Sequence, residues 1–141
     1  MIILDTNIVS EFMGAPPNPT VLAWLKTIPI HEICITTLQT AEIMKGLVDL
    51  PEGRRRDGLF RDYRAFRSSL PNTNILPFDE AAAIEFGVLW VHRARLGRRI
   101  QEVDAQIAAI ARARGCTLAT HDTQDFMDCG LILIDPFTHR A

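Results

Sequence analysis

The stretch IILDTN (residues 2–7) begins as a short apolar run and ends in three polar residues of the kind that cap helices. It predicts a buried strand that leads directly into a helix. Similar apolar runs recur at residues 33–35, 117–120 and 131–134. These runs do not alternate between polar and apolar residues, which is typical of parallel strands covered on both faces. The pattern therefore predicts an α/β fold with a short parallel sheet.

Helical patterns separate these runs. Apolar residues at helical spacing predict helices over residues 19–28, 37–48, 54–70, 79–91 and 100–114, and Gly115 follows the last of them as a C-cap. Helices between parallel strands cover both faces of the sheet, so the expected architecture has three layers, α/β/α. No repeat, low-complexity tract or linker divides the chain. We expect one domain over residues 1–141.

The composition is that of a folded, soluble protein, because 48% of the 141 residues are apolar and 23% are charged. Three cysteines without CxxC spacing argue against a disulfide framework and a zinc ribbon. No apolar run approaches the length of a membrane span, and the N-terminus lacks the features of a signal peptide. We therefore expect a cytoplasmic protein without a membrane anchor.

The net charge of −2 is unevenly distributed along the chain. Residues 54–114 contain twelve arginines against seven acids, whereas residues 1–53 contain six acids against two lysines. A surface for a polyanion is therefore expected in the middle of the chain, and a cation site among residues near its two ends. The six arginines within residues 54–67 allow two interpretations, a solvated helix face or a phosphate-binding surface.

Four acids lie at or near the carboxyl ends of the predicted strands. Asp5 follows the first strand, Asp122 follows a later one, and Glu42 and Asp104 lie early in two of the helices. Ligands of parallel α/β sheets bind beyond the carboxyl ends of the strands. The placement predicts that these acids converge on one cavity.

Each acid also has a simpler explanation. Asp5 or Asp122 caps a helix, Glu42 pairs with Lys45 three residues later, and Asp104 interacts favourably with the dipole of its helix. These explanations account for each acid separately. They do not account for the placement of all four near strand ends.

Convergence of the four acids requires a positive partner. Two carboxylates ~4 Å apart repel by about 4 kcal/mol at an effective dielectric constant near 20. An arginine from the middle of the chain is one candidate, but a hard cation such as Mg2+ or Mn2+ suits a cluster of oxygen ligands better. Such an ion lowers the pKa of a bound water and stabilises charge on a phosphoryl oxygen. The acids therefore predict metal-dependent phosphoryl chemistry.

Five segments of the chain are similar to a known family. They are MIILDTNIVSE (1–11), ITTLQTAEIMKG (35–46), LPFDEAAA (76–83), EVDAQIAAIARARG (102–115) and LATHDTQDF (118–126). In this order and at these separations they resemble the PIN-domain ribonucleases. Within that family they are most similar to the VapC/FitB-type toxins of type II toxin–antitoxin pairs.

The resemblance places the acidic quartet of that family, which is both catalytic and metal-binding, on Asp5, Glu42, Asp104 and Asp122. These are the four acids that placement alone had singled out.

The resemblance also assigns roles to neighbouring residues. Thr6 matches a hydroxyl residue beside the metal, Asn7 a residue that orders the turn, and Thr120 a residue that supports the fourth acid. Asp125 is only a peripheral candidate at a variable position. His121 has no assigned role, and we expect it to face solvent.

The resemblance implies a PIN-like fold and Mg2+-dependent, alternatively Mn2+-dependent, hydrolysis of RNA that leaves a 5′-phosphate and a 3′-hydroxyl. It implies a homodimer and a cognate VapB/FitA-like antitoxin. The C-terminal segment of that antitoxin would block the site, and its N-terminal domain would bind operator DNA.

Four arginines precede the helix of Asp104, namely Arg93, Arg95, Arg98 and Arg99. We expect this group to lie near the acids, with Arg98 or Arg99 as a contact for RNA or the antitoxin.

Two alternatives to the nuclease remain. The first is a binding module, in which the protein is a non-catalytic partner in an antitoxin–operator DNA complex. The second is a phosphatase with an aspartate nucleophile. The phosphatase requires a second acid two residues after the first, where this chain has Asn7.

Overall fold

A five-stranded parallel sheet lies at the centre of the computed structural model, which describes residues 1–140. The strand order is β3-β2-β1-β4-β5, and all four pairings are parallel. The strands are β1 (Ile2–Leu4), β2 (Ile33–Thr36), β3 (Ile75–Leu76), β4 (Thr117–Ala119) and β5 (Leu133–Ile134). The predicted α/β class is therefore confirmed.

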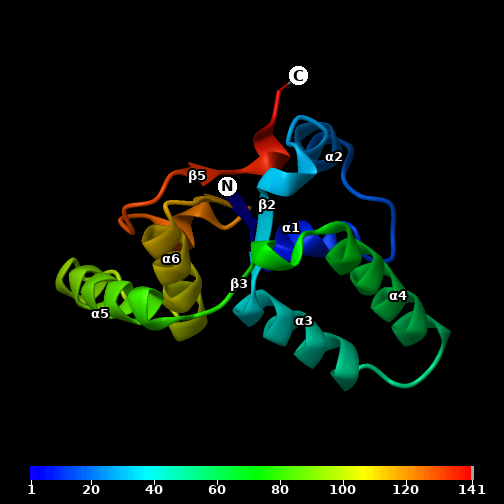
Figure 1. Cartoon of the computed structure of the whole chain (residues 1–141), viewed down its shortest axis with the longest axis horizontal. Helices are drawn as coiled ribbons and strands as arrows, with labels where there is room; N and C mark the ends of the chain where they lie inside the picture. Colours follow the sequence, from blue (N-terminus) through cyan, green and yellow to red (C-terminus); the bar gives the residue numbers. More distant parts are fainter. Residues whose placement is uncertain (141) are drawn as a thin grey trace.

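Six α-helices flank this sheet, with α3 and α4 on one side of the molecule and α5 and α6 on the other (Figure 1). Their bounds are α1 (Thr6–Ser10), α2 (Pro19–Leu25), α3 (Thr37–Asp49), α4 (Arg54–Ser69), α5 (Glu80–Arg95) and α6 (Glu102–Arg114). Four short 3-10 turns complete the chain, of which η3 (Thr123–Phe126) lies beside the site described below.

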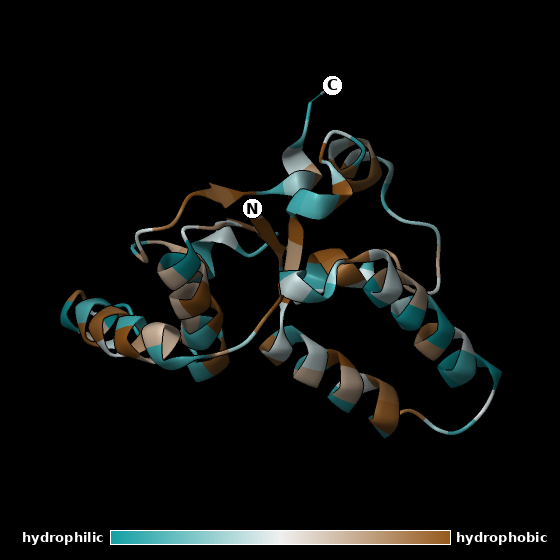
Figure 2. Cartoon of the chain, in the orientation of Figure 1, coloured by the Kyte–Doolittle hydropathy of each residue, from teal (hydrophilic) through white to brown (hydrophobic). Residues whose placement is uncertain are grey.

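Two hydrophobic clusters cover the two faces of the sheet. Along β4, Leu118 packs with α5 and α6, whereas the next residue, Ala119, packs with the helices of the opposite layer. Ile3 and Leu4 of β1 divide in the same way. Successive strand residues point to opposite faces, so both sides of each strand are buried. The strands therefore appear as apolar segments at the centre of Figure 2, and the three-layer prediction is confirmed.

Local sequence accounts for the helix ends nearest the sheet. Thr36, the last residue of β2, accepts a hydrogen bond from the Gln39 amide, and the Gln39 side chain accepts one from the Thr36 amide. This capping box starts α3 directly at the carboxyl end of the strand. At the other end of the molecule, Gly115 closes α6 with a φ of 65°, a conformation that favours glycine.

The sequence patterns missed β3 and overestimated β5. β3 contains only two residues and is followed by Pro77, so it has neither the length nor the pattern of a strand. The fourth apolar run was expected over residues 131–134, but only Leu133 and Ile134 pair with β4. The helix expected from residue 100 begins at Glu102.

The remaining class-level expectations concern cysteines and membranes. All three cysteines are buried and free, as expected. Among residues 1–140 no helix has the length and apolar character needed to cross a bilayer.

Candidate functional site

The strand order reverses direction at β1, which has β2 on one side and β4 on the other. Such a switch point leaves a crevice at the carboxyl ends of the central strands. Asp5 lies at that end of β1, and its amide donates to the Ala119 carbonyl at the end of β4 (2.8 Å). The reversal therefore brings the segments of Asp5 and Asp122 together although the two residues are 117 positions apart in the sequence.

Thr120 links these two segments. Its hydroxyl donates to Oδ2 of Asp5 (2.7 Å) and accepts from the amide of Asp122 (3.0 Å). The Thr120 side chain is completely buried, and Asp5 is nearly so. A hydroxyl that donates to one neighbour and accepts from another fixes both, so Thr120 sets the position of the chain at Asp122 relative to the Asp5 carboxylate.

Two residues that follow Asp5 hold the other acids. Thr6 donates from its hydroxyl to Oε2 of Glu42 (2.9 Å). Asn7 donates from Nδ2 to Oδ2 of Asp122 (3.0 Å). The first turn of α1 therefore contacts the acids of α3 and of the segment after β4. The structure brings together Asp5, Glu42 and Asp122 through three polar side chains.

The simpler explanations of the acids hold only in part. Asp5 does cap α1, because its Oδ1 accepts from the Thr6 amide (2.9 Å). Asp122 precedes η3 but makes no side-chain cap. Glu42 is not paired with Lys45 among the ion pairs of residues 1–140. A capping or pairing role therefore leaves Glu42 and Asp122 unexplained.

The pKa of Asp104 reflects the negative charge of the acids around it. Burial, and after it the charges of Asp5, Asp125, Glu42 and Asp122, together raise the pKa of its carboxyl from the ordinary 3.8 to about 6. All of these charges repel a carboxylate on α6. The four predicted acids, together with Asp125, thus act on one region.

Asp5 has a raised pKa for the same main reason, which is burial. The hydrogen bonds from Thr120 and Thr6 lower this pKa in part, and the charge of Asp122 raises it again. Hydrogen bonds to a carboxylate favour its charged form. The site therefore contains partly compensated negative charge.

No protein cation balances this charge within residues 1–140. None of the four acids takes part in an ion pair. Arg98 pairs instead with Asp128 (2.9 Å), and Arg99 lies beside a small separate cavity of about 130 Å³. The alternative in which an arginine occupies the cluster is therefore wrong for the described part of the chain.

The carboxylates of Asp5, Glu42, Asp104 and Asp122 do not form a closed metal cage. Among residues 1–140 no three His, Cys, Asp or Glu side chains are close enough to hold an ion between them. Their oxygen donors and uncompensated charge nevertheless fit Mg2+, which retains several waters and commonly takes only one or two carboxylates together with substrate phosphates. The donor set thus suits a hydrated ion better than a closed metal cage.

Two residues near the acids were missed or undervalued by the sequence analysis. Gln39 is fully buried, and its Nε2 has no hydrogen-bond partner in the described chain, although its amide lowers the pKa of Asp5. A buried amide group without a partner is costly, and the effect of Gln39 on the pKa of Asp5 places this group beside the acids. Asp125, expected only at the periphery, lies close enough to raise the pKa of Asp104.

Two predictions concern the individual residues His121 and Arg93. His121 is exposed as expected, and its Nδ1 lies 3.2 Å from Oδ2 of Asp135. Arg93 belongs to the group of four arginines that were expected to lie near the acids, and it is buried with only 5% of its surface exposed. Its guanidinium binds backbone carbonyl groups inside the protein, so the contact for RNA or the antitoxin remains a prediction for Arg98 or Arg99.

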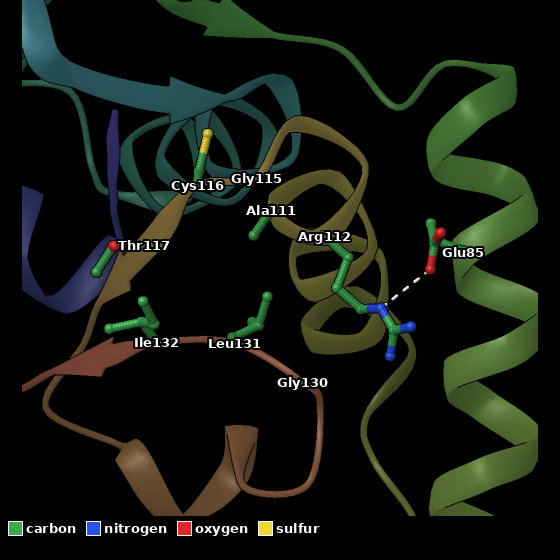
Figure 3. A pocket seen from close by; sticks show the side chains of 9 residues that line it. All are labelled: Glu85, Ala111, Arg112, Gly115, Cys116, Thr117, Gly130, Leu131 and Ile132. Carbon is green, nitrogen blue, oxygen red and sulfur yellow. Dashed lines mark ion pairs between the residues drawn. The ribbon is translucent and has the colours of Figure 1, made fainter.

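A larger cavity lies away from the acids. It has a volume of about 380 Å³ and is lined by Glu85, Arg112, Thr117 and neighbouring residues (Figure 3). Thr117 begins β4, so this cavity is at the amino ends of the strands. An ion pair of Arg112 with Glu85 (3.0 Å) lies beside it. The carboxylates, which follow the carboxyl ends of β1 and β4, and this cavity are therefore at opposite ends of the sheet.

The chain is similar to known proteins in family, in sequence and in structure. Residues 2–128 match the PIN domain family. The chain is 37% identical over 139 residues to the VapC ribonuclease Y4jK of Sinorhizobium fredii, with 97% of this chain and 98% of that protein aligned. It is 32% identical to toxin FitB of Neisseria gonorrhoeae, with 97% and 99% aligned.

A solved structure of FitAB bound to an IR36 DNA fragment has the same fold. The TM-score is 0.91 at 30% identity, and the match covers 100% of this chain and 99% of that chain.

Proposed function

Because this chain belongs to the PIN domain family, we propose that it is an Mg2+- or Mn2+-dependent endoribonuclease and the toxin of a type II toxin–antitoxin pair. One observation carries the proposal. Burial and the charges of four other acids raise the pKa of Asp104 to about 6, and no cation of residues 1–140 forms an ion pair with the four predicted acids. Hydrolysis of a phosphodiester requires positive charge at the site where RNA brings its own negative charge.

Asp5, Glu42, Asp104 and Asp122 would hold the ion. A bound divalent ion supplies a water of lowered pKa and stabilises charge on the phosphoryl oxygen. The side chains of this protein orient the ligands for it, with Thr120 on Asp5, Thr6 on Glu42 and Asn7 on Asp122. Because these side chains already hold the carboxylates in place in the free protein, the carboxylates need to move less when the ion and RNA bind.

The partners follow from the similarity to complexes. The solved FitAB structure, which includes a DNA fragment, matches this chain over nearly its whole length. We therefore include in the proposal a FitA- or VapB-like antitoxin that inhibits the enzyme and binds operator DNA. We also include a homodimer, and a cytoplasmic location where RNA is accessible.

Cleavage of RNA by the purified protein tests the proposal. We expect Mg2+ or Mn2+ to support cleavage, EDTA to abolish it, and an excess of the ion to restore it. The products should carry a 5′-phosphate and a 3′-hydroxyl, which end-specific ligation and phosphatase treatment detect. The double variant Asp5→Asn/Asp104→Asn, purified in parallel, controls for contaminating nucleases.

Two results would contradict the proposal in different ways. Cleavage that survives both EDTA and the double substitution would show that the acids are not the catalytic groups. A wild-type protein that neither cleaves RNA nor arrests growth when expressed without its antitoxin would favour the non-catalytic DNA-complex alternative.

A further inference from the structure

Arg93 is a buried cation that contacts no carboxylate among residues 1–140. Only 5% of its surface is exposed, and its hydrogen bonds go to three backbone carbonyls and the thiol of Cys129. Burial of an unpaired charge is costly unless several strong hydrogen bonds compensate it. A guanidinium buried in this way indicates that its hydrogen bonds hold particular backbone segments in place. The positions of its acceptors show which segments these are.

The acceptors lie on two segments that are far apart in the sequence. Nε donates to the carbonyl of Arg98 (2.6 Å), in the loop that leads into α6 and Asp104. Nη1 donates to the carbonyls of Asp125 (2.9 Å) and Met127 (2.6 Å), at the end of η3. One rigid planar group thus joins the segment before α6 to the segment after β4.

Both segments carry acids of the site. The amide of Asp125 donates to the carbonyl of Asp122 (3.0 Å), so η3 connects the Arg93 contact directly to Asp122. The charges of Asp125 and Asp122 both act on Asp104. A change in the distance between the two segments would therefore change the separation of these carboxylates.

We propose that Arg93 is a positioning residue that sets the separation of Asp104 from Asp122 and Asp125, and thereby the affinity of the pocket for a divalent ion. This inference rests on the proposed function, because it assigns the pocket to an ion. Residues that orient metal ligands from outside the coordination sphere typically change metal affinity or activity by about ten- to a hundred-fold when replaced.

Arg112 provides a matched control. Its Nη1 donates to the carbonyl of Cys129 (3.2 Å), so it holds the same loop at a point beyond η3. Its other contact, with Glu85, lies at the opposite end of the sheet from the acids. Replacement of Arg112 loosens the loop without removing a contact to Asp125 or Met127.

The test measures Mn2+ binding by titration calorimetry in the wild-type protein and in Arg93→Met, Arg93→Lys and Arg112→Met, with the Tm of each metal-free protein recorded. We expect both Arg93 variants to bind Mn2+ about tenfold or more weakly. Arg93→Lys keeps the charge but not the planar fork that spans the two segments. Arg112→Met should lower the Tm and leave the Mn2+ affinity within about twofold of wild type.

Wild-type Mn2+ affinity in a folded Arg93 variant would overturn the positioning role, as would an equal loss in Arg112→Met at equal Tm. Arg93→Lys decides the question if Arg93→Met does not fold. A wild-type protein that binds neither Mn2+ nor Mg2+ would overturn the proposed function itself, and with it this role. In RNA cleavage, Arg93→Lys should lower kcat and leave KM for RNA unchanged, because a residue with only 5% of its surface exposed offers little surface for a direct contact with RNA.

Discussion

Replacement of Asp104 by asparagine is expected to lower the kcat of RNA cleavage by about a thousand-fold, which corresponds to about 4 kcal/mol of transition-state stabilisation. Asn keeps the size of the side chain and removes its charge. The charges of Asp5, Asp125, Glu42 and Asp122 all reach Asp104, so this position lies where the negative charge of the pocket is concentrated. Loss of a carboxylate there weakens the hold on a divalent ion most directly.

Glu102→Gln is the control for this prediction. Glu102 is exposed, lies in the same first turn of α6 and loses the same charge near the helix N-terminus. Gel-based cleavage assays at saturating Mg2+ should show near-wild-type kcat for Glu102→Gln. A kcat of Asp104→Asn within about tenfold of wild type would contradict the catalytic assignment.

The same substitution should stabilise the metal-free protein. Asp104→Asn is expected to raise the free energy of unfolding by about 2 kcal/mol at pH 7 without divalent ions. A pKa raised from 3.8 to about 6 corresponds to about 3 kcal/mol of penalty on the ionised folded state. Partial exposure of the side chain and the lost interaction with the helix N-terminus, about 0.3–1 kcal/mol, reduce the gain.

The gain should depend on pH in a defined direction. Above about pH 6 Asp104 is ionised in both the folded and the unfolded protein, and the folded state carries the full repulsion. As the pH falls from about 6 toward 3.8, the folded state takes up a proton first and the penalty disappears. The wild type and Asp104→Asn should therefore converge in stability near pH 4.

Urea unfolding of both proteins with EDTA at pH 7 and pH 4 measures this difference. Glu102→Gln again serves as the control, and it should show no gain at pH 7, because its charge lies outside the pocket. Equal stability of wild type and Asp104→Asn at both pH values would mean that the acids do not repel one another in the folded protein.

A single residue thus has opposite effects on stability and on activity, a trade-off common at functional sites.

Two acids of the site were predictable because they follow strands, and a parallel sheet brings the carboxyl ends of its strands to one edge, whereas Glu42 and Asp104 lie in helices. Asp5 follows β1, and Asp122 follows β4, which pairs with β1 in register. The positions of Asp5 and Asp122 can be predicted from the hydrophobic pattern of the strands, without knowing which contacts their side chains make.

The hydrogen bonds that support the four acids could not be predicted from the sequence patterns. Roles for Thr6, Asn7 and Thr120 came only from the family resemblance, since a hydroxyl or an amide beside an acid is common in any chain. The pairing of Asn7 with Asp122 depends on a contact between residues 115 positions apart. Only the order of the strands in space creates such a contact.

The burial of Arg93 was likewise not predictable from the sequence. Its sequence neighbours Arg95, Arg98 and Arg99 are all exposed, and nothing in the local pattern marks Arg93 as the buried member. Its burial follows from the way the loop after η3 folds back over the end of α5. Strand β3 was missed for a related reason, because a two-residue strand is defined by its partner β2 and not by its own residues.

The most direct test of a shared divalent-ion pocket is the Tm of the wild-type protein with and without Mg2+. An ion at about a hundred times its Kd adds about 2.7 kcal/mol, which for a protein of this size corresponds to a Tm increase of roughly 5–10 °C. We expect a saturable increase of this order in the wild type and its loss in Asp5→Asn. A wild-type Tm that neither Mg2+ nor Mn2+ changes would contradict the account.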